Sequence, residues 1–159
     1  DMIEEGRMVS LEREVFPRLI PHGLYAFHEE GYWSDAGTLP AYLEAQRLLL
    51  ESGGSGVADA TDSSRADIHP HVLIGAGSFV EGRIGPNVVL GKGCKIGRSS
   101  IRHAALFDGV SVDDKVELES SIVGERAAIG EGAIVRNAII GDGVQVAPHA
   151  HLNGARVGR

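Results

Sequence analysis

The stretch IVGERAAIGEGAIVRNAIIGDGVQVAPHAHLNGARV, residues 122–157, decides the fold of this chain. Large apolar residues recur in it at steps of six or five, and the whole pattern starts again 17 residues on. The series is Val123, Ile129, Val135, Ile140, Val146, Leu152 and Val157. A helix would repeat about every 3.6 residues and a single strand every two. A step near six therefore predicts short strands wound into triangular coils, with each side sending one large apolar side chain inward.

The same pattern extends back to residue 68. Its earlier members are Ile68, Ile74, Val80, Ile84, Leu90, Ile96, Leu106, Val112 and Leu118. A small or β-branched residue stands two positions before each of them, which suits a narrow interior, and Cys94 is expected to fill such a place as packing. Glycines such as Gly75, Gly91 and Gly124 often follow the apolar residue, which predicts corners with positive φ.

This pattern resembles the hexapeptide repeat of left-handed parallel β-helices. We therefore expect a mainly β chain with a left-handed parallel β-helix over residues 68–159. Coils of such an array are stable only by stacking, and a last coil exposes unpaired backbone groups. We expect the β-helix to mediate homo-oligomerisation.

Composition excludes several classes of function. The formal net charge is −7 and the pI is about 5.4, which argues against nucleic acid held through its phosphates. No apolar run approaches the ~20 residues of a membrane span, and the first ten residues lack the apolar core of a signal peptide. The single cysteine, Cys94, cannot form an internal disulfide, so a cytoplasmic location is expected.

The first part of the chain differs in composition from the repeats. Most aromatic residues lie before residue 43, and residues 51–67 are rich in Gly, Ser, Asp and Ala, which predicts a linker. Within residues 1–50, Ser10 can cap a helix that Pro17 kinks or ends. GLYAF, residues 23–27, alternates like a short strand. Thr38 can cap a second helix with Pro40 in its first turn, and that helix's apolar face includes Leu39, Tyr42, Leu43, Leu49 and Leu50.

Three stretches carry a resemblance to a known family. SLEREVFPRLI at 10–20, GLYAF at 23–27 and GYWSDAGTLPAYLEAQRLLL at 31–50, followed by the repeats, resemble the last part of a sugar-1-phosphate nucleotidyltransferase. The mannose-1-phosphate guanylyltransferase type is the nearest in pattern. Residues 1–50 would then be the closing α/β elements of a catalytic domain. That family's Gly-rich nucleotide-binding loop has no counterpart in this sequence, so the resemblance implies a missing N-terminal catalytic domain and an inactive fragment.

The resemblance also implies roles for three residues. In such enzymes a sugar-1-phosphate oxygen attacks the α-phosphorus of a nucleoside triphosphate, and Mg²⁺ helps to neutralise the developing charge. The family's W-x-D-x-G-T motif places the Mg²⁺-binding aspartate at Asp35, with Gly37 and Trp33 beside the sugar. Ala36 and an additional Leu39 depart from the family pattern. One carboxylate is too few to hold Mg²⁺, so no cofactor is expected for this chain alone.

Several alternatives remain open from the residues themselves. Asp35 can be a turn residue whose carboxylate bonds nearby backbone N–H groups, and Trp33 can be domain core. The pairs His69/His71 and His149/His151 could chelate Zn²⁺ if they lie on strands, although no third ligand is suitably spaced.

Two other functions are alternatives to the nucleotidyltransferase. A hexapeptide-repeat acyltransferase would need a histidine base, for which His103 is the candidate, and an expelled loop that this sequence lacks. A non-catalytic assembly or regulatory module is the more serious alternative, because the same architecture can serve assembly without catalysis.

Overall fold

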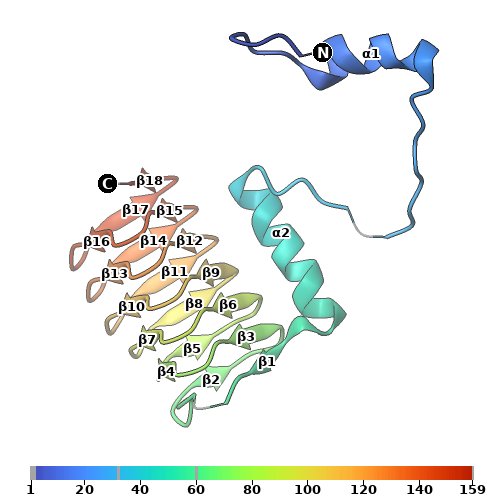
Figure 1. Cartoon of the computed structure of the whole chain (residues 1–159). Coiled ribbons are helices and arrows are strands. Elements are labelled where there is room, and N and C mark those ends of the chain that lie inside the picture. The colour runs from blue at the N-terminus through green and yellow to red at the C-terminus, as the bar shows by residue number, and fades with distance from the viewer. Residues whose placement is uncertain (1–2, 32, 60, 159) are drawn as a thin grey trace. The chain divides into compact units, whose positions relative to one another are not determined.

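A computed structural model describes residues 3–31, 33–59 and 61–158, which divide into two units, Asp1–Trp33 and Ser34–Arg159. The second unit is a parallel β-solenoid with one helix alongside it (Figure 1). A mainly β, parallel coil is therefore confirmed. No helix within the described ranges is long and apolar enough to cross a bilayer.

Each side of the coil stacks into its own parallel sheet. The seven-stranded sheet contains β1 (Gly56–Val57), β3 (Val72–Ile74), β6 (Val88–Leu90), β9 (Ala104–Leu106), β12 (Ile122–Val123), β15 (Ile139–Ile140) and β18 (Arg156–Val157). The five-stranded sheet contains β4 (Phe79–Val80), β7 (Lys95–Ile96), β10 (Ser111–Val112), β13 (Ala128–Ile129) and β16 (Gln145–Val146). The six-stranded sheet contains β2 (Asp67–Ile68), β5 (Arg83–Ile84), β8 (Ser100–Arg102), β11 (Glu117–Glu119), β14 (Ile134–Arg136) and β17 (His151–Asn153).

The strand register places the periodic apolar residues directly above one another inside the solenoid. In the seven-stranded sheet the inward ladder is Ile74, Leu90, Leu106, Val123, Ile140 and Val157. The six-stranded sheet adds Ile101, which pairs with Ile84 and Leu118 and is fully buried. The predicted series omits Ile101, because the advance per coil changes from 16 to 17 residues in this part of the repeat.

The prediction that the glycines after the apolar residues have positive φ is wrong at most positions. Of the described glycines in that place, Gly85 has a positive φ of 104°, whereas Gly75 and Gly91 do not. A Cβ on Gly75 would lie 2.6 Å from the backbone of Gly91, and one on Gly91 would lie 2.6 Å from Asp108 N. These glycines are required because the next coil passes too close for any side chain. Positive φ falls instead on other corner residues, including His103 and Asn137.

Residues 51–67, expected to form a linker, contribute to the solenoid. β1 pairs with β3 in parallel, and Asp62 forms an isolated parallel bridge with Phe79. The small residues of this segment are compatible with strand pairing at the start of the stack, where β1 has one neighbour.

The first unit forms one helical segment and an extended segment. Leu11–Val15 is a π-helical stretch capped by Ser10, whose Oγ accepts a hydrogen bond from Arg13 N, and α1 (Phe16–Leu19) continues it with Pro17 in its first turn. A 3₁₀ turn, Ile20–His22, follows. The strand predicted at residues 23–27 is wrong, because these residues have no strand partner among those described and Tyr25 and Phe27 are 91% and 88% exposed.

Candidate functional site

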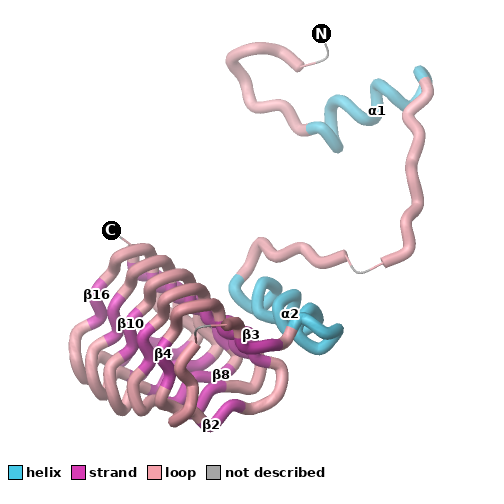
Figure 2. The backbone as a smooth tube through the Cα atoms, turned by 60° about the horizontal axis from the view of Figure 1, so that its bottom comes forward, coloured by secondary structure: helices cyan, strands magenta, loops and turns pink. Residues whose placement is uncertain are grey.

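Helix α2 (Leu39–Leu49) links the sequence motif around Asp35 to the solenoid. Thr38 caps it, with Oγ1 accepting a hydrogen bond from Ala41 N at 3.4 Å, and Pro40 occupies the first turn. This start and its cap were predicted correctly. The helix runs beside the seven-stranded sheet (Figures 1 and 2), and Leu50, just after it, is buried. Leu49, expected on the buried face, is instead exposed.

A single glutamine fixes α2 to two successive coils. Gln46 is 9% exposed, and its Nε2 donates to the backbone oxygens of Asn87 at 3.2 Å and Ala104 at 3.0 Å. Because both amide hydrogens are used, Gln46 satisfies one carbonyl in each of two neighbouring coils. Sequence reasoning missed this residue. The available signal was a polar side chain in line with Tyr42 and Leu50, each four residues away on the helix.

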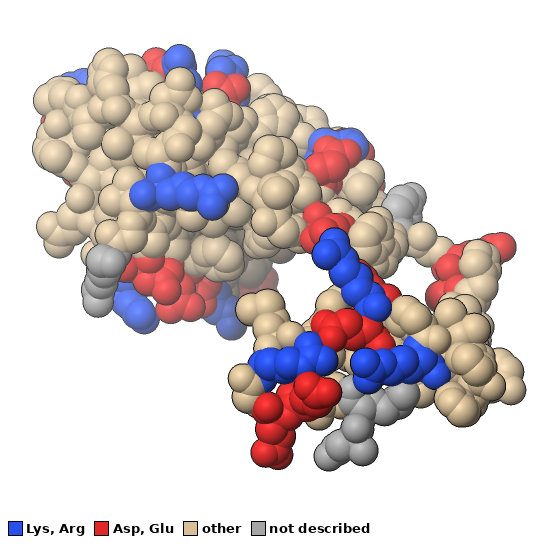
Figure 3. All heavy atoms as spheres, turned by 90° about the horizontal axis from the view of Figure 1, so that it is seen from above, with Lys and Arg blue, Asp and Glu red and all other residues tan. Residues whose placement is uncertain are grey.

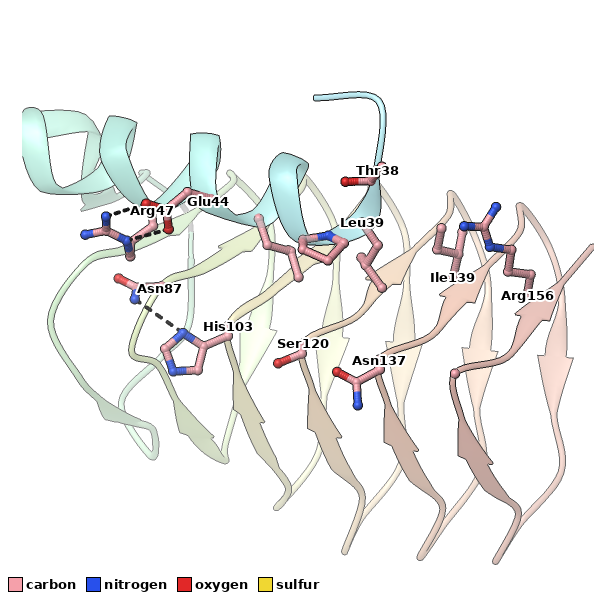
Figure 4. A pocket seen from close by; sticks show the side chains of 13 residues that line it. Thr38, Leu39, Glu44, Arg47, Asn87, His103, Ser120, Asn137, Ile139 and Arg156 are labelled. Atoms are coloured by element: carbon pink, nitrogen blue, oxygen red, sulfur yellow. Dashed lines mark hydrogen bonds and ion pairs between the residues drawn. The ribbon is translucent and has the colours of Figure 1, made fainter. Parts of the chain in front are cut away.

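A groove of about 480 Å³ lies between α2 and the later coils (Figure 4). Leu39, Pro40 and Leu43 of the helix form one wall. The opposite wall is a row of corner residues, one per coil, and Ile139 and Arg156 of the seven-stranded sheet. The corner row is Asn87, His103, Ser120, Asn137 and Gly154, and each has a positive φ.

Asn87 and His103 form a polar pair at one end of this groove. Asn87 Nδ2 lies 3.3 Å from His103 Nδ1 (Figure 4). The donor and acceptor roles in this pair depend on the tautomer of His103. Asn87 is 7% exposed, and its Oδ1 has no hydrogen-bond partner within the described part of the chain. A buried amide oxygen without a donor costs free energy, so this end of the groove has an unmet hydrogen bond.

Charged side chains on α2 border the same groove. Arg47 contacts Glu44 at 2.6 Å and Glu51 at 2.5 Å. Hydrogen bonds that Arg47 donates to Glu44 and then to Glu51 raise the pKa of Arg47, and the guanidinium in turn lowers the pKa of Glu44. Arg47 is therefore already neutralised, whereas Arg156 at the far end makes no ion pair among the residues described.

The residues predicted for substrate and metal lie just before α2. Asp35 Oδ1 accepts a hydrogen bond from Gly37 N at 3.0 Å, so these two residues form one Asx turn. Both are exposed, and Trp33 is 86% exposed. The turn leaves Asp35 Oδ2 without a bond among the described groups. Across the described ranges, no group of three or more His, Cys, Asp or Glu side chains could hold a metal ion.

The His-x-His pairs do not lie side by side on strands. His71 and His149 occupy corners with φ of 60° and 58°, so the premise of a shared strand face is wrong. His69 Nε2 lies 3.3 Å from Asp67 Oδ2 without hydrogen-bond geometry. His103 is also a corner residue, directed toward Asn87 (Figure 4). Cys94 is fully buried, and burial raises the pKa of its thiol, which confirms packing as its role.

Comparison with known proteins identifies relatives along nearly the whole chain. The family described as GMPPB C-terminal domain matches residues 63–158. Mannose-1-phosphate guanylyltransferase 1 of Arabidopsis thaliana is 33% identical over 96% of this chain and 44% of its own length. The mannose-1-phosphate guanyltransferase of Schizosaccharomyces pombe is 32% identical over the same shares.

A second kind of transferase is also similar. The glucose-1-phosphate adenylyltransferase of Corynebacterium jeikeium is 27% identical over 92% of this chain and 39% of its own length. The chain thus spans less than half the length of the curated relatives it matches.

Proposed function

Because the chain belongs to the GMPPB C-terminal domain family, we propose that it supplies the solenoid part of a nucleotidyltransferase. The proposed reaction joins a sugar 1-phosphate to a nucleoside triphosphate, giving a nucleotide sugar of the GDP-mannose type and pyrophosphate. The observation that carries this proposal is the similarity to mannose-1-phosphate guanylyltransferases over 96% of the chain. The catalytic nucleotide-binding domain would lie in the part of the relatives that this chain does not match.

Asp35 is proposed as one Mg²⁺ ligand of the whole enzyme. Its exposed carboxylate is a suitable hard-oxygen donor, and the Asx turn with Gly37 holds it while one oxygen stays available. Mg²⁺ would neutralise charge on the phosphate oxygens. One carboxylate cannot complete the site, so further ligands would come from the catalytic domain and the phosphates. Trp33 and Gly37 are proposed to border the sugar.

The solenoid is proposed to be left-handed and to hold enzyme subunits together. The exposed aromatic side chains of Phe79 and Phe107 offer apolar contacts for a second subunit. Ion pairs between adjacent coils, such as Arg98–Asp114 and Arg102–Glu119, brace the stack. On the face that Figure 3 shows, acidic and basic side chains lie beside one another in several places.

The proposal is tested by pyrophosphate release from GTP and mannose 1-phosphate with Mg²⁺. Residues 1–159, checked by intact mass at 16.8 kDa, are compared with the same chain joined to a catalytic domain. We expect turnover from the joined protein and none from residues 1–159. Turnover by the 16.8 kDa chain alone would refute the proposal that catalysis requires a separate nucleotide-binding domain.

A non-catalytic assembly module is the second candidate. It is favoured by the docking of α2 through Gln46, which is a structural contact and needs no substrate. An Asp35→Asn variant separates the two functions in the joined protein. If the joined protein is a transferase, Asp35→Asn lowers its turnover because a metal ligand is removed. If it is an assembly module, the unchanged protein shows no turnover and the variant keeps the same oligomeric state.

A further inference from the structure

We propose that the outer face of the five-stranded sheet is self-complementary, so that two copies of this chain pair through it about a twofold axis. The proposal rests on the role given above to the solenoid in holding subunits together, and it names the surface that does so. The axis runs parallel to the strands, between β7 and β10. Each strand then faces a strand of the second copy, β4 facing β13 and β7 facing β10.

The five-stranded sheet has an open outer face. Helix α2 lies beside the seven-stranded sheet, on another side of the coil (Figures 1 and 2). One residue of each strand in the five-stranded sheet points outward: Phe79, Lys95, Ser111, Ala128 and Gln145. Phe79 is 41% exposed and is the only large apolar side chain in this outward row, whose other members are small or polar.

A second exposed phenylalanine interrupts a column of glycines. The residues that directly follow β3, β6, β12, β15 and β18 are Gly75, Gly91, Gly124, Gly141 and Gly158. Phe107 stands in the same place after β9, at the corner that leads into β10, and is 41% exposed. The coil does not need an aromatic side chain there, because its neighbours are built with glycine. Exposed aromatic residues are enriched where proteins contact one another.

The proposed axis places both phenylalanines over small residues. The strand register makes Gly91 and Phe107 equivalent positions on adjacent coils. Phe107 of one copy therefore faces Gly91 of the other, and Phe79 faces Ala128. Because glycine and alanine leave space above them, an aromatic ring can lie over each. Twofold symmetry repeats both contacts, so the interface contains four such rings.

The charged residues on this face are complementary under the same axis. Lys92 and Lys95 belong to the coil that contains β7, whereas Asp108 and Asp113 belong to the coil that contains β10. Within the part of the chain that the structure describes, none of these four side chains makes an ion pair. The axis sets Lys92 opposite Asp108 of the second copy. Unpaired charges of opposite sign that meet across an interface fix its register.

Lys95 can reach Asp113 of the second copy. It faces Ser111, and Asp113 lies two residues further on, about 7 Å along the chain. A hollow of about 420 Å³ that Lys95 and Asp113 both line leaves room for these side chains. Four strands on each side make a small interface, so we expect a weak dimer with a dissociation constant of roughly 10–100 μM.

The first experiment is sedimentation velocity of residues 1–159 over concentrations that span this constant. We expect a monomer–dimer equilibrium. Phe107→Gly should weaken it about a hundredfold, since symmetry removes two aromatic anchors of about tenfold each. This change installs the residue that the neighbouring coils carry, so the fold is retained. Leu73→Ala is the matched control, because Leu73 is 39% exposed on the seven-stranded sheet, and it should leave the equilibrium unchanged.

Charge reversal tests which residues face each other. Lys95→Glu and Asp113→Lys should each weaken self-association at least tenfold, because like charges then meet twice across the axis. An equimolar mixture of the two variants should form a heterodimer, because every reversed charge then faces its opposite on the other chain. Circular dichroism of each variant confirms that it is folded.

The outcomes separate this surface from the general role of the solenoid. A dimer that Phe107→Gly leaves intact, equal weakening by Leu73→Ala, or a mixture that forms no heterodimer would overturn this surface while leaving the proposed oligomerisation standing. A monomer at every concentration would overturn both. The transferase reaction is tested separately by the release of pyrophosphate.

Discussion

Individual residues in this solenoid are selected by the neighbouring coil as well as by their own strand. Ser99 shows this clearly. Its Oγ donates to Asp113 O at 2.6 Å and accepts from Val116 N at 2.9 Å, and the side chain is buried. Ser78 and Ser121 make the same kind of two-way bond in other coils. These serines occupy places where the coil backbone would otherwise leave an amide without a partner.

Ser99→Ala should lower the free energy of unfolding by about 1–3 kcal/mol, because Val116 N then loses its acceptor while it remains buried. Urea denaturation followed by circular dichroism measures the change. Ser100→Ala is the control, since the Ser100 hydroxyl makes no hydrogen bond among the described residues. Equal loss in both variants would contradict the role given to Ser99.

Gly91→Ala should destabilise the solenoid by about 1–3 kcal/mol or more, because the new methyl group collides with the backbone at Asp108. Gly93 provides the contrast. Its φ is 65° and a Cβ there would meet nothing within 4 Å, so Gly93→Asn should have a small effect. Thermal unfolding of both variants tests the prediction, and a larger loss for Gly93→Asn would refute it.

At the scale of secondary-structure elements, α2 is held by one specific polar contact and by apolar packing. Gln46→Ala should leave the carbonyl oxygen of Ala104 without a donor, at a cost of about 1–3 kcal/mol, whereas Asn87 O keeps its hydrogen bond from Ala104 N. The change should appear in hydrogen exchange as faster exchange of the α2 amides with the β14 amides unaffected.

Arg47→Ala is the matched change on the same helix. It removes two exposed ion pairs, which contribute about 0.3–0.5 kcal/mol each on a helix surface. Faster α2 exchange after Arg47→Ala than after Gln46→Ala would mean that ion pairs, not Gln46, hold the helix.

The coil of short strands and its core could be predicted from sequence because every coil places large apolar side chains at equivalent positions facing inward. Ile101 was missed since the early coils advance 16 residues, as from Ile74 to Leu90, and the later ones 17, as from Leu106 to Val123. The strand predicted at residues 23–27 was wrong because alternation alone supplies no partner strand. The contacts of Gln46 and the position of the groove depend on which face of α2 packs on which coil. That packing is a tertiary contact, so no local sequence pattern predicts it.

At the scale of the whole molecule, stability should fall in acid. Hydrogen bonds from the Arg98 backbone and side chain lower the pKa of Asp114, and Lys115 lowers that of Glu131. A carboxyl group with a lowered pKa in the folded state stabilises the protein above its ordinary value of about 4 and loses this contribution as pH falls below it.

Urea midpoints should therefore decrease from about pH 5 toward about pH 3, within the carboxyl range. Asp114→Asn should make this decrease shallower, because one of the titrating carboxylates is absent. Asp59→Asn is the control, an exposed carboxylate without such a partner among the described residues. An unchanged acid slope in Asp114→Asn would contradict the prediction.

The attachment of α2 to two adjacent coils also constrains how such a protein can change its length during evolution. Duplicating a coil after β9 leaves both Gln46 contacts intact and simply extends the stack. Inserting a coil between β6 and β9 separates the two carbonyls by one further strand spacing of about 4.8 Å, beyond the reach of one amide nitrogen. Gains and losses of coils should therefore accumulate on the β12–β18 side, while the two coils that Gln46 joins stay adjacent.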